Sequence, residues 1–350
     1  EALIRWIHPE QGLIPPFNFL PVIDNTSLEV ELGAWVIETA LQQLNTWQSQ
    51  GITLEVSVNI SSYHLLSANF IADLEAALMR HPNIQSQYLQ LELLESSVLS
   101  DLTVIATIIN HCRDELGVKI ALDDFGTGYS SLTHLRNLRA NTIKIDQTFV
   151  RDLLDIPDDY AIIDGVIGLA KSFNRGIIAE GVETTEHGLM LMLMGCQQAQ
   201  GYGIARPMPA ADFPEWFKLY IPNQEWLSCG NAQWSERESR AKLFNLIAQQ
   251  WLSLFENNIN SEPADIKRWP IMDDKKCHHT CWIEHSKQEG IYSVAGIEAL
   301  YQAHKKMDIF AQAMQKKYLA DDFEGARADL PALHDLSKAL HAVLANELAT

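Results

Sequence analysis

Hydrophobic and polar positions change their period along the chain, and the change divides it into two parts. Up to about residue 220, short β-branched runs alternate with longer segments of helical period, a pattern typical of repeated βα units around a parallel sheet. We predict strands at Ala2–Trp6, Leu54–Asn59, Leu89–Leu93, Val118–Asp123, Thr142–Asp146, Gly176–Glu180 and Gln198–Gly201. We predict helices between them at Leu28–Gln50, Asn69–Arg80, Leu102–Leu116, Ser131–Leu138, Tyr160–Phe173 and Glu186–Met194.

The strand signals stop beyond residue 221. Residues 221–235 are polar and contain Pro and Trp, whereas Glu236–Asn257, Val294–Tyr318 and Phe323–Leu348 have the period of helices. The chain therefore predicts an α/β domain at 1–220, a linker at 221–235 and an all-α helical bundle at 236–350. For the α/β domain we expect a TIM-like (β/α)₈ barrel.

Polar residues fall in or directly after the apolar runs of the predicted strands, where folding alone would favour aliphatic side chains. In a barrel of this class the carboxyl ends of the strands share one mouth. Carboxylates gathered there would repel one another and raise their pKa values, so divalent cations are the simplest stabiliser. The alternative is a set of solvated strand ends and caps. The residues are Glu1, Asn59, Glu92, Asp123, Asp124, Lys144, Asp146, Glu180, Glu183 and Gln200.

Charge and cysteine content narrow the function classes. With 26 basic and 45 acidic residues the formal charge is −19, which argues against binding to DNA, since nucleic-acid binding relies on Lys and Arg. The five cysteines are odd in number and scattered, which favours a reducing compartment and a cytoplasmic location. The longest apolar run, Leu189–Met194, is too short to span a bilayer. Because the chain starts at Glu1 without Met, we expect a fragment of a longer polypeptide.

Seven motifs occur in order along the first part, and together they resemble the EAL family of cyclic di-GMP phosphodiesterases. The resemblance covers about 220 residues. The motifs are Glu1-Ala2-Leu3-Ile4-Arg5-Trp6, Val58-Asn59-Ile60-Ser61, Leu91-Glu92-Leu93-Leu94-Glu95-Ser96, Asp123-Asp124-Phe125-Gly126-Thr127-Gly128-Tyr129-Ser130-Ser131-Leu132, Ile143-Lys144-Ile145-Asp146, Ala179-Glu180-Gly181-Val182-Glu183-Thr184, and Gln200-Gly201-Tyr202 with Arg206-Pro207.

The resemblance implies two Mg²⁺ or Mn²⁺ ions and a hydrolytic reaction that converts cyclic di-GMP to linear pGpG. It implies that Asp123 bridges the two ions, that Lys144 is the catalytic lysine and that Glu183 orients the lysine or the water. Two ions of this kind acidify a water and neutralise a phosphodiester. The metal ligands implied are Glu1, Asn59, Glu92 and Asp123 for one ion, and Asp123, Asp124 and Glu180 for the other.

The resemblance also implies substrate contacts and a dimer. Phe125–Leu138 is similar to the family's loop for homodimerisation, and Glu95 is the glutamate that anchors this loop. The family's first strand precedes the Glu-Ala-Leu motif, so we expect an N-terminally truncated barrel here. Upstream sensory or GGDEF-type domains are compatible with such a start. The substrate-binding residues implied are Leu3, Arg5, Asp146, Gln200 and Pro207.

The helical tail resembles, more faintly, the chemoreceptor zinc-binding (CZB) bundle. The similarity lies in Cys277-His278-His279-Thr280-Cys281-Trp282 and in Ala299-Leu300-Tyr301-Gln302-Ala303-His304. It implies Zn²⁺ bound by Cys277 and His304, with Asp308 at a position where the family has His. Cys281, His278, His279 or His285 could complete the set. A regulatory or oligomerising bundle without metal is the alternative.

Three functions are compared on these residues. A metal-dependent phosphodiesterase tuned by the helical tail is favoured, because every catalytic position of the family is filled. A non-catalytic cyclic di-GMP receptor is the main alternative, and product formation separates the two. An unrelated barrel enzyme such as a metal-dependent lyase does not explain the ordered motifs.

Overall fold

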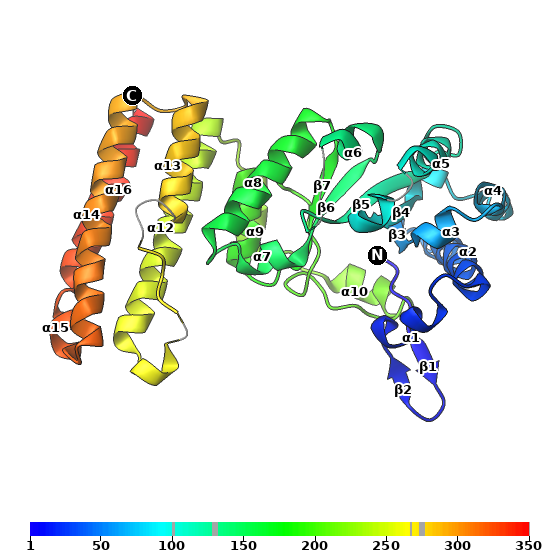
Figure 1. Ribbon diagram of the computed structural model, residues 1–350, viewed down its shortest axis with the longest axis horizontal. Helices are drawn as coiled ribbons and strands as arrows, with labels where there is room; N and C mark the ends of the chain where they lie inside the picture. Colours follow the sequence, from blue (N-terminus) through cyan, green and yellow to red (C-terminus); the bar gives the residue numbers. More distant parts are fainter. Residues whose placement is uncertain (100–101, 128–131, 267, 273–276, 350) are drawn as a thin grey trace. The chain divides into compact units, whose positions relative to one another are not determined.

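The computed structural model describes residues 1–99, 102–127, 132–266, 268–272 and 277–349 (Figure 1). The chain divides into two compact units. Unit 1 comprises Glu1–Gln147, Gly168–Glu180 and Gln200–Ile221, and unit 2 comprises Thr148–Ile167, Gly181–Ala199 and Pro222–Thr350. Unit 2 thus combines the tail with segments of the βα part, and the domain boundaries expected near 220 and 236 stay a prediction.

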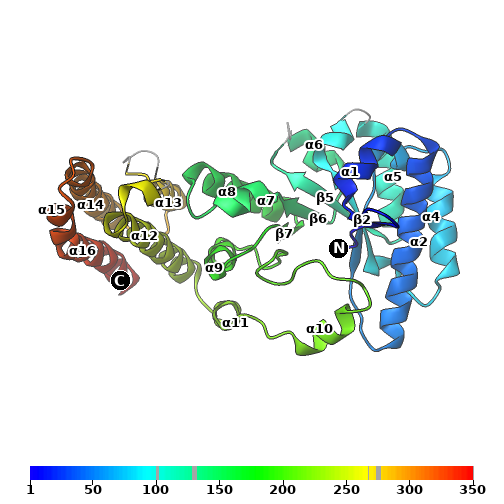
Figure 2. The ribbon, with the colours of Figure 1, turned by 90° about the horizontal axis from the view of Figure 1, so that it is seen from below.

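Unit 1 is built on a parallel sheet with the strand order β3-β4-β5-β6-β7, which is also the order along the chain (Figure 1). Figure 2 shows β5, β6 and β7 of this sheet from below. Both faces of the sheet are covered, so its strands are apolar nearly throughout; Val58, Leu91, Ile120 and Ile143 are all buried. The parallel α/β class is therefore confirmed. The strands are β3 (Val56–Asn59), β4 (Leu89–Leu94), β5 (Lys119–Phe125), β6 (Thr142–Ile145) and β7 (Gly176–Ala179).

The first and last expected strands are wrong as regular strands. Ala2 makes a single parallel bridge with Val58, and the regular strand β1 (Trp6–His8) instead pairs antiparallel with β2 (Gly12–Ile14). Residues 198–201 contain no regular strand but only an isolated bridge residue, Ala199, next to which Gln200 N–H donates to Ala179 O at 2.8 Å. Both segments are held by few backbone hydrogen bonds, and the sequence pattern does not distinguish such a segment from a fully paired strand.

The helices of the βα part follow the predicted pattern with shifts of a few residues at their ends. α2 packs through Ile37, Leu41 and Leu44, which repeat at helical spacing. Short helices that the prediction lacks precede α2, follow β3 and β6, and occupy Phe213–Leu219. The helices are α1 (Pro16–Ile23), α2 (Ser27–Ser49), α3 (Ser62–Leu65), α4 (Phe70–Arg80), α5 (Leu102–Asp114), α6 (Leu132–Asn137), α7 (Gln147–Asp152), α8 (Pro157–Ser172), α9 (Thr185–Met194) and α10 (Phe213–Leu219).

The tail is helical as predicted, but its elements differ in three places. The linker 221–235 contains α11, whose Trp226 indole N–H donates to Thr185 O at 2.9 Å. The expected helix Phe323–Leu348 is divided near Asp329. A further helix, α13, was not predicted. The elements are α11 (Gln224–Asn231), α12 (Glu236–Asn260), α13 (His278–Glu289), α14 (Val294–Leu319), α15 (Phe323–Ala328) and α16 (Leu330–Ala349).

α13 escaped prediction because its sequence is polar and its apolar positions show little helical period. Its ends nevertheless carry ordinary signals. The Sγ of Cys277 caps the first turn by accepting from Thr280 N–H at 3.4 Å, and Gly290 ends the helix with a φ of 68°. Among the described helices, none combines the length and apolar character needed to cross a membrane.

Candidate active site

The parallel strands deliver their polar side chains to one edge of the sheet. Asn59 ends β3 and is paired with Glu92 of β4. Asp123, Lys144 and Glu180 come from the same ends of β5, β6 and β7. Parallel strands share the direction of their carboxyl ends, so side chains distant in sequence meet here. The predicted convergence of these residues is confirmed by the contacts of unit 1.

The ammonium of Lys144 lies at the centre of this cluster. Its Nζ is 2.7 Å from Glu180 Oε1, 2.8 Å from Glu92 Oε2 and 3.0 Å from Asp123 Oδ1. Glu1 Oε2 is 3.6 Å away. The side chains of Lys144 and Glu92 are each 1% exposed, so water contributes little to their solvation. One cation is therefore shared by four carboxylates.

Two amide side chains link the carboxylates at the edge of the cluster. Asn59 Nδ2 donates to Glu1 Oε1 at 2.7 Å. Gln200 Nε2 donates to Glu180 Oε1 at 2.5 Å and to Glu1 Oε2 at 3.1 Å. These bonds fix Glu1 and Glu180 with respect to each other across nearly 180 residues of sequence. The amides thereby preorganise oxygen ligands rather than neutralise them.

An irregularity in β5 brings two consecutive aspartates to the same site. The register of β5 against β6 shifts between Leu122 and Phe125, and Asp124 has a φ of 54°. Side chains of a regular strand alternate between faces, whereas a bulge with a left-handed residue redirects one of them. Carboxylate oxygens of Asp123, Asp124 and Glu180 all lie within 4.8 Å of one another.

The cluster holds more negative charge than Lys144 balances. Burial, a hydrogen bond with Asp146 and the charge of Asp123 raise the pKa of Asp124 to about 7. Burial, partly opposed by Lys144, raises the pKa of Glu180 to about 7. Burial and the nearby Glu1 likewise raise the pKa of Glu92. Additional positive charge at this edge would therefore stabilise the ionised carboxylates.

The donor set fits hard divalent cations. Asp123, Asp124 and Glu180 supply oxygen atoms close enough to share an ion, and oxygen ligands favour Mg²⁺ or Mn²⁺ over Zn²⁺. Oδ1 of Asp123 is buried, and no described residue forms a hydrogen bond with it. Its electrostatic partner is the ammonium of Lys144, 3.0 Å away. A buried acceptor of this kind is a natural ligand atom.

The remaining predicted site residues occupy varied surroundings. Leu3, Arg5 and Pro207 are exposed, as a residue contacting a diffusible substrate must be. Glu95 is buried, and its Oε2 accepts from Gly126 N–H at 3.0 Å, which agrees with the expected anchoring contact. Glu183 is exposed. Their roles stay predictions, and residues 128–131 of the expected dimerisation loop lie outside the described residues.

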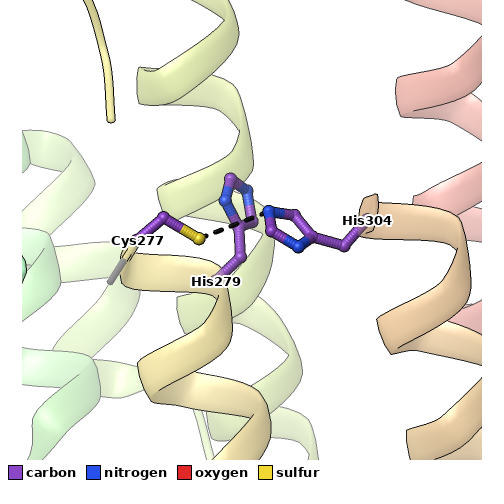
Figure 3. Close-up of side chains that lie close together, drawn as sticks. All are labelled: Cys277, His279 and His304. Atoms are coloured by element: carbon purple, nitrogen blue, oxygen red, sulfur yellow. Dashed lines mark hydrogen bonds between the residues drawn. The ribbon is translucent and has the colours of Figure 1, made fainter. Parts of the chain in front are cut away.

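The predicted zinc ligands of the tail also meet. Cys277 Sγ is 3.3 Å from His304 Nε2, which in turn is 3.3 Å from Asp308 Oδ2. The cluster contains His279 as well (Figure 3), a residue that the sequence offered only as one of several substitutes. Its position on α13 could not be distinguished from those of His278 and His285 without knowing where that helix begins.

Comparison with known proteins connects the barrel site to a family. The family model described as the EAL domain matches residues 1–207. The chain belongs to the EAL domain family. It is 37% identical over 218 residues to the cyclic di-GMP phosphodiesterase PA2567 of Pseudomonas aeruginosa, covering 62% of this chain and 37% of that protein. It is 38% identical over 221 residues to the cyclic di-GMP phosphodiesterase PdeR of Escherichia coli, covering 63% and 33%.

Solved structures of EAL domains have the same fold. The PaMucR phosphodiesterase in complex with c-di-GMP is 38% identical with a TM-score of 0.58, covering 61% of this chain and 85% of that chain. The EAL domain of Mycobacterium smegmatis DcpA is 33% identical with a TM-score of 0.52, covering 55% and 87%. These neighbours confirm the TIM-like class. The chain spans about a third of the length of the curated relatives it matches.

Proposed function

We propose that this EAL chain is a metal-dependent phosphodiesterase that hydrolyses cyclic di-GMP to linear pGpG. The observation that carries the proposal is the set of oxygen ligands held around Lys144 at the carboxyl edge of the sheet. Relatives named cyclic di-GMP phosphodiesterases, more than 35% identical to this chain over the EAL region, support the substrate. The surplus of negative charge supports divalent ions, Mg²⁺ or Mn²⁺.

Each residue of the cluster has a proposed task. Glu1, Asn59, Glu92 and Asp123 would hold one ion, and Asp123, Asp124 and Glu180 the other. Such ions, when bound, activate a water and neutralise the phosphate. Lys144 places a compact positive charge where negative charge develops during attack.

Substrate recognition falls to residues around this cluster. The guanidinium of Arg5 suits phosphate oxygens, and Leu3, Asp146, Gln200 and Pro207 complete the proposed contacts. Glu183 is proposed to orient Lys144 or the water, and Glu95 to position the loop that begins at Phe125. These assignments follow the family motifs residue by residue.

Product analysis tests the function directly. The chain is incubated with cyclic di-GMP and Mg²⁺ or Mn²⁺, and the nucleotides are separated by chromatography. We expect pGpG from the wild type, its loss on chelation, and its loss in Glu92→Gln. Glu55→Gln, a surface control paired with Lys119, retains turnover. Binding of cyclic di-GMP without any linear product would identify a receptor instead and refute the proposed hydrolysis.

We further propose a homodimer through Phe125–Leu138 and a cytoplasmic location. The contact of Glu95 with Gly126 supports an ordered start of the dimerisation loop. Cysteines without disulfide bonds, Cys112, Cys196, Cys229, Cys277 and Cys281, support a reducing compartment. The greater length of the relatives supports additional sensory or GGDEF-type domains in the whole protein.

A further inference from the structure

Three arginines gather at the amino end of the sheet in unit 1, the end opposite the candidate active site. Arg113 lies in the last turn of α5, which leads into β5. Arg139 lies three residues before β6, and Arg175 lies directly before β7. Because β5, β6 and β7 are parallel neighbours (Figure 1), the segments that precede them lie side by side. A hydrogen bond of 2.8 Å from Gly176 N–H to Asn141 O joins two of these segments.

One carboxylate holds two of the three guanidinium groups. Nε of Arg113 donates to Asp114 Oδ1 at 2.8 Å, and Nη1 of Arg139 donates to Asp114 Oδ2 at 3.3 Å. Nη1 of Arg113 also donates to Arg139 O at 2.8 Å. The side chain of Arg113 is 14% exposed and that of Arg139 is 54% exposed. Asp114 therefore positions both groups, and Arg139 still presents most of its donors to solvent.

The third guanidinium, that of Arg175, is left without a counter-charge. Its Nε is buried, and no described residue forms a hydrogen bond with it. The ion pairs of Asp114 reach Arg113 and Arg139, whereas none of the described carboxylates pairs with Arg175. Burial and the charges of the other two arginines all lower the pKa of Arg175. An added anion would therefore stabilise this half-buried cation.

The charge of the cluster indicates which anion fits. Three guanidinium groups and one carboxylate give it a net charge of +2, in a chain whose formal charge is −19. A phosphate monoester carries close to two negative charges at neutral pH, whereas a phosphodiester carries one. Guanidinium groups are weakly hydrated and match phosphate oxygens with pairs of parallel hydrogen bonds. The cluster thus favours a terminal phosphate group over a diester.

We propose that Arg113, Arg139 and Arg175 bind a terminal phosphate group, either inorganic phosphate or the phosphomonoester end of a nucleotide. Asp114 is a positioning residue, since it orients two of the arginines. The site is separate from the barrel carboxylates, because the amino and carboxyl ends of parallel strands lie at opposite edges of a sheet. It needs no divalent ion and does not rest on the proposed hydrolysis.

Thermal unfolding of the full chain tests the site in EDTA, which removes divalent ions from the barrel carboxylates. Inorganic phosphate is titrated at mildly alkaline pH, where it is mainly a dianion, and sodium chloride of equal ionic strength is the reference. A ligand that binds only the folded state raises the Tm. We expect phosphate and GMP to raise it, and guanosine and dimethyl phosphate to leave it unchanged. Equal affinities for phosphate and GMP would identify the phosphate group as the whole ligand, whereas tighter binding of GMP would identify a nucleotide.

Matched variants locate the binding. Arg175→Gln and Arg139→Gln should each weaken phosphate binding roughly tenfold or more, since each removes hydrogen bonds between charged groups. Arg80→Gln is the control, because Arg80 is an exposed arginine of α4 that pairs with Glu38. It should respond to phosphate as the wild type does, which accounts for the general stabilisation of proteins by phosphate salts.

Circular dichroism in phosphate-free buffer checks that each variant is folded. If Arg175→Gln does not fold, the more exposed Arg139→Gln decides alone. A wild type whose Tm responds to phosphate no more than to chloride would overturn the site. Folded Arg175→Gln and Arg139→Gln proteins with the wild-type phosphate response would overturn it as well.

Discussion

Replacing Lys144 with Met removes the ammonium around which the barrel carboxylates are arranged. Met has a similar length, so the substitution removes charge with little change of volume. The pair Lys144–Glu92 is 2.8 Å apart and both side chains are 1% exposed. Removing one partner of a buried ion pair costs roughly 3–5 kcal/mol, because the other charge is left uncompensated.

The expected loss is large enough to measure by thermal unfolding. At about 2–4 °C per kcal/mol for a unit of this size, Lys144→Met lowers the Tm by roughly 6–20 °C in EDTA. Lys119→Met is the control, since Lys119 at the start of β5 pairs with Glu55, the residue before β3, and their side chains are 39% and 34% exposed. Exposed pairs contribute at most about 1 kcal/mol, so the control shifts the Tm by a few degrees.

Divalent ions provide a second arm of the same experiment. If the carboxylates bind Mn²⁺, the ion replaces part of the missing charge, and adding it raises the Tm of Lys144→Met more than that of the wild type. The reasoning is refuted if Lys144→Met and Lys119→Met unfold within a few degrees of each other in EDTA.

Four further predictions concern a steric clash at Gly33, the pH dependence of stability, the left-handed backbone at Asp124 and the removal of metal from the tail. In Gly33→Ala the new Cβ would lie 2.1 Å from His64 Nδ1, so thermal unfolding should show that the free energy of unfolding falls by about 1–3 kcal/mol. Gly165→Ala is the control, because its new Cβ would have no atom within 4 Å, and its free energy of unfolding should not fall. Burial lowers the pKa of His64, so the unfolded chain binds a proton that the native chain excludes; wild-type stability should fall as the pH drops below about 6.5, and His64→Gln should flatten that slope in denaturant titrations. Asp124→Asn should keep the left-handed backbone but lose activity, whereas Asp124→Val should also lose about 1–2 kcal/mol of stability; equal Tm values for the two would contradict this. If the tail binds Zn²⁺, as its resemblance to the CZB bundle implies, removing the metal with a chelator should speed hydrogen exchange in the first turn of α13 and leave α10 unchanged.

Much of the barrel could be predicted because its strands are buried on both faces. A short, largely apolar run such as Leu89–Leu93 predicts a buried strand. The polar residue near the end of each run then marks the edge of the sheet at which the carboxyl ends of the strands meet. The contacts between Lys144, Glu92 and Glu180 follow from parallel strand order alone. The family motifs then assign roles that the spacing does not.

Other features depend on geometry that the residue pattern does not contain. Strand alternation predicts opposite faces for Asp123 and Asp124, and the bulge in β5 brings them together. α13 depends on its capping residue and on packing of Trp282 rather than on a helical period. The position of His279 beside His304 depends on where α13 begins, which the residue pattern does not contain.

The claim that the barrel carboxylates hold two divalent ions for hydrolysis of cyclic di-GMP is tested most directly by crystallography with manganese. Crystals of the chain grown with cyclic di-GMP and Mn²⁺ should give two anomalous peaks about 3.5–4 Å apart. The peaks should be bridged by Asp123 and flanked by Glu92 and Glu180. A well-ordered barrel edge with bound nucleotide and no anomalous peak among these side chains would contradict the account.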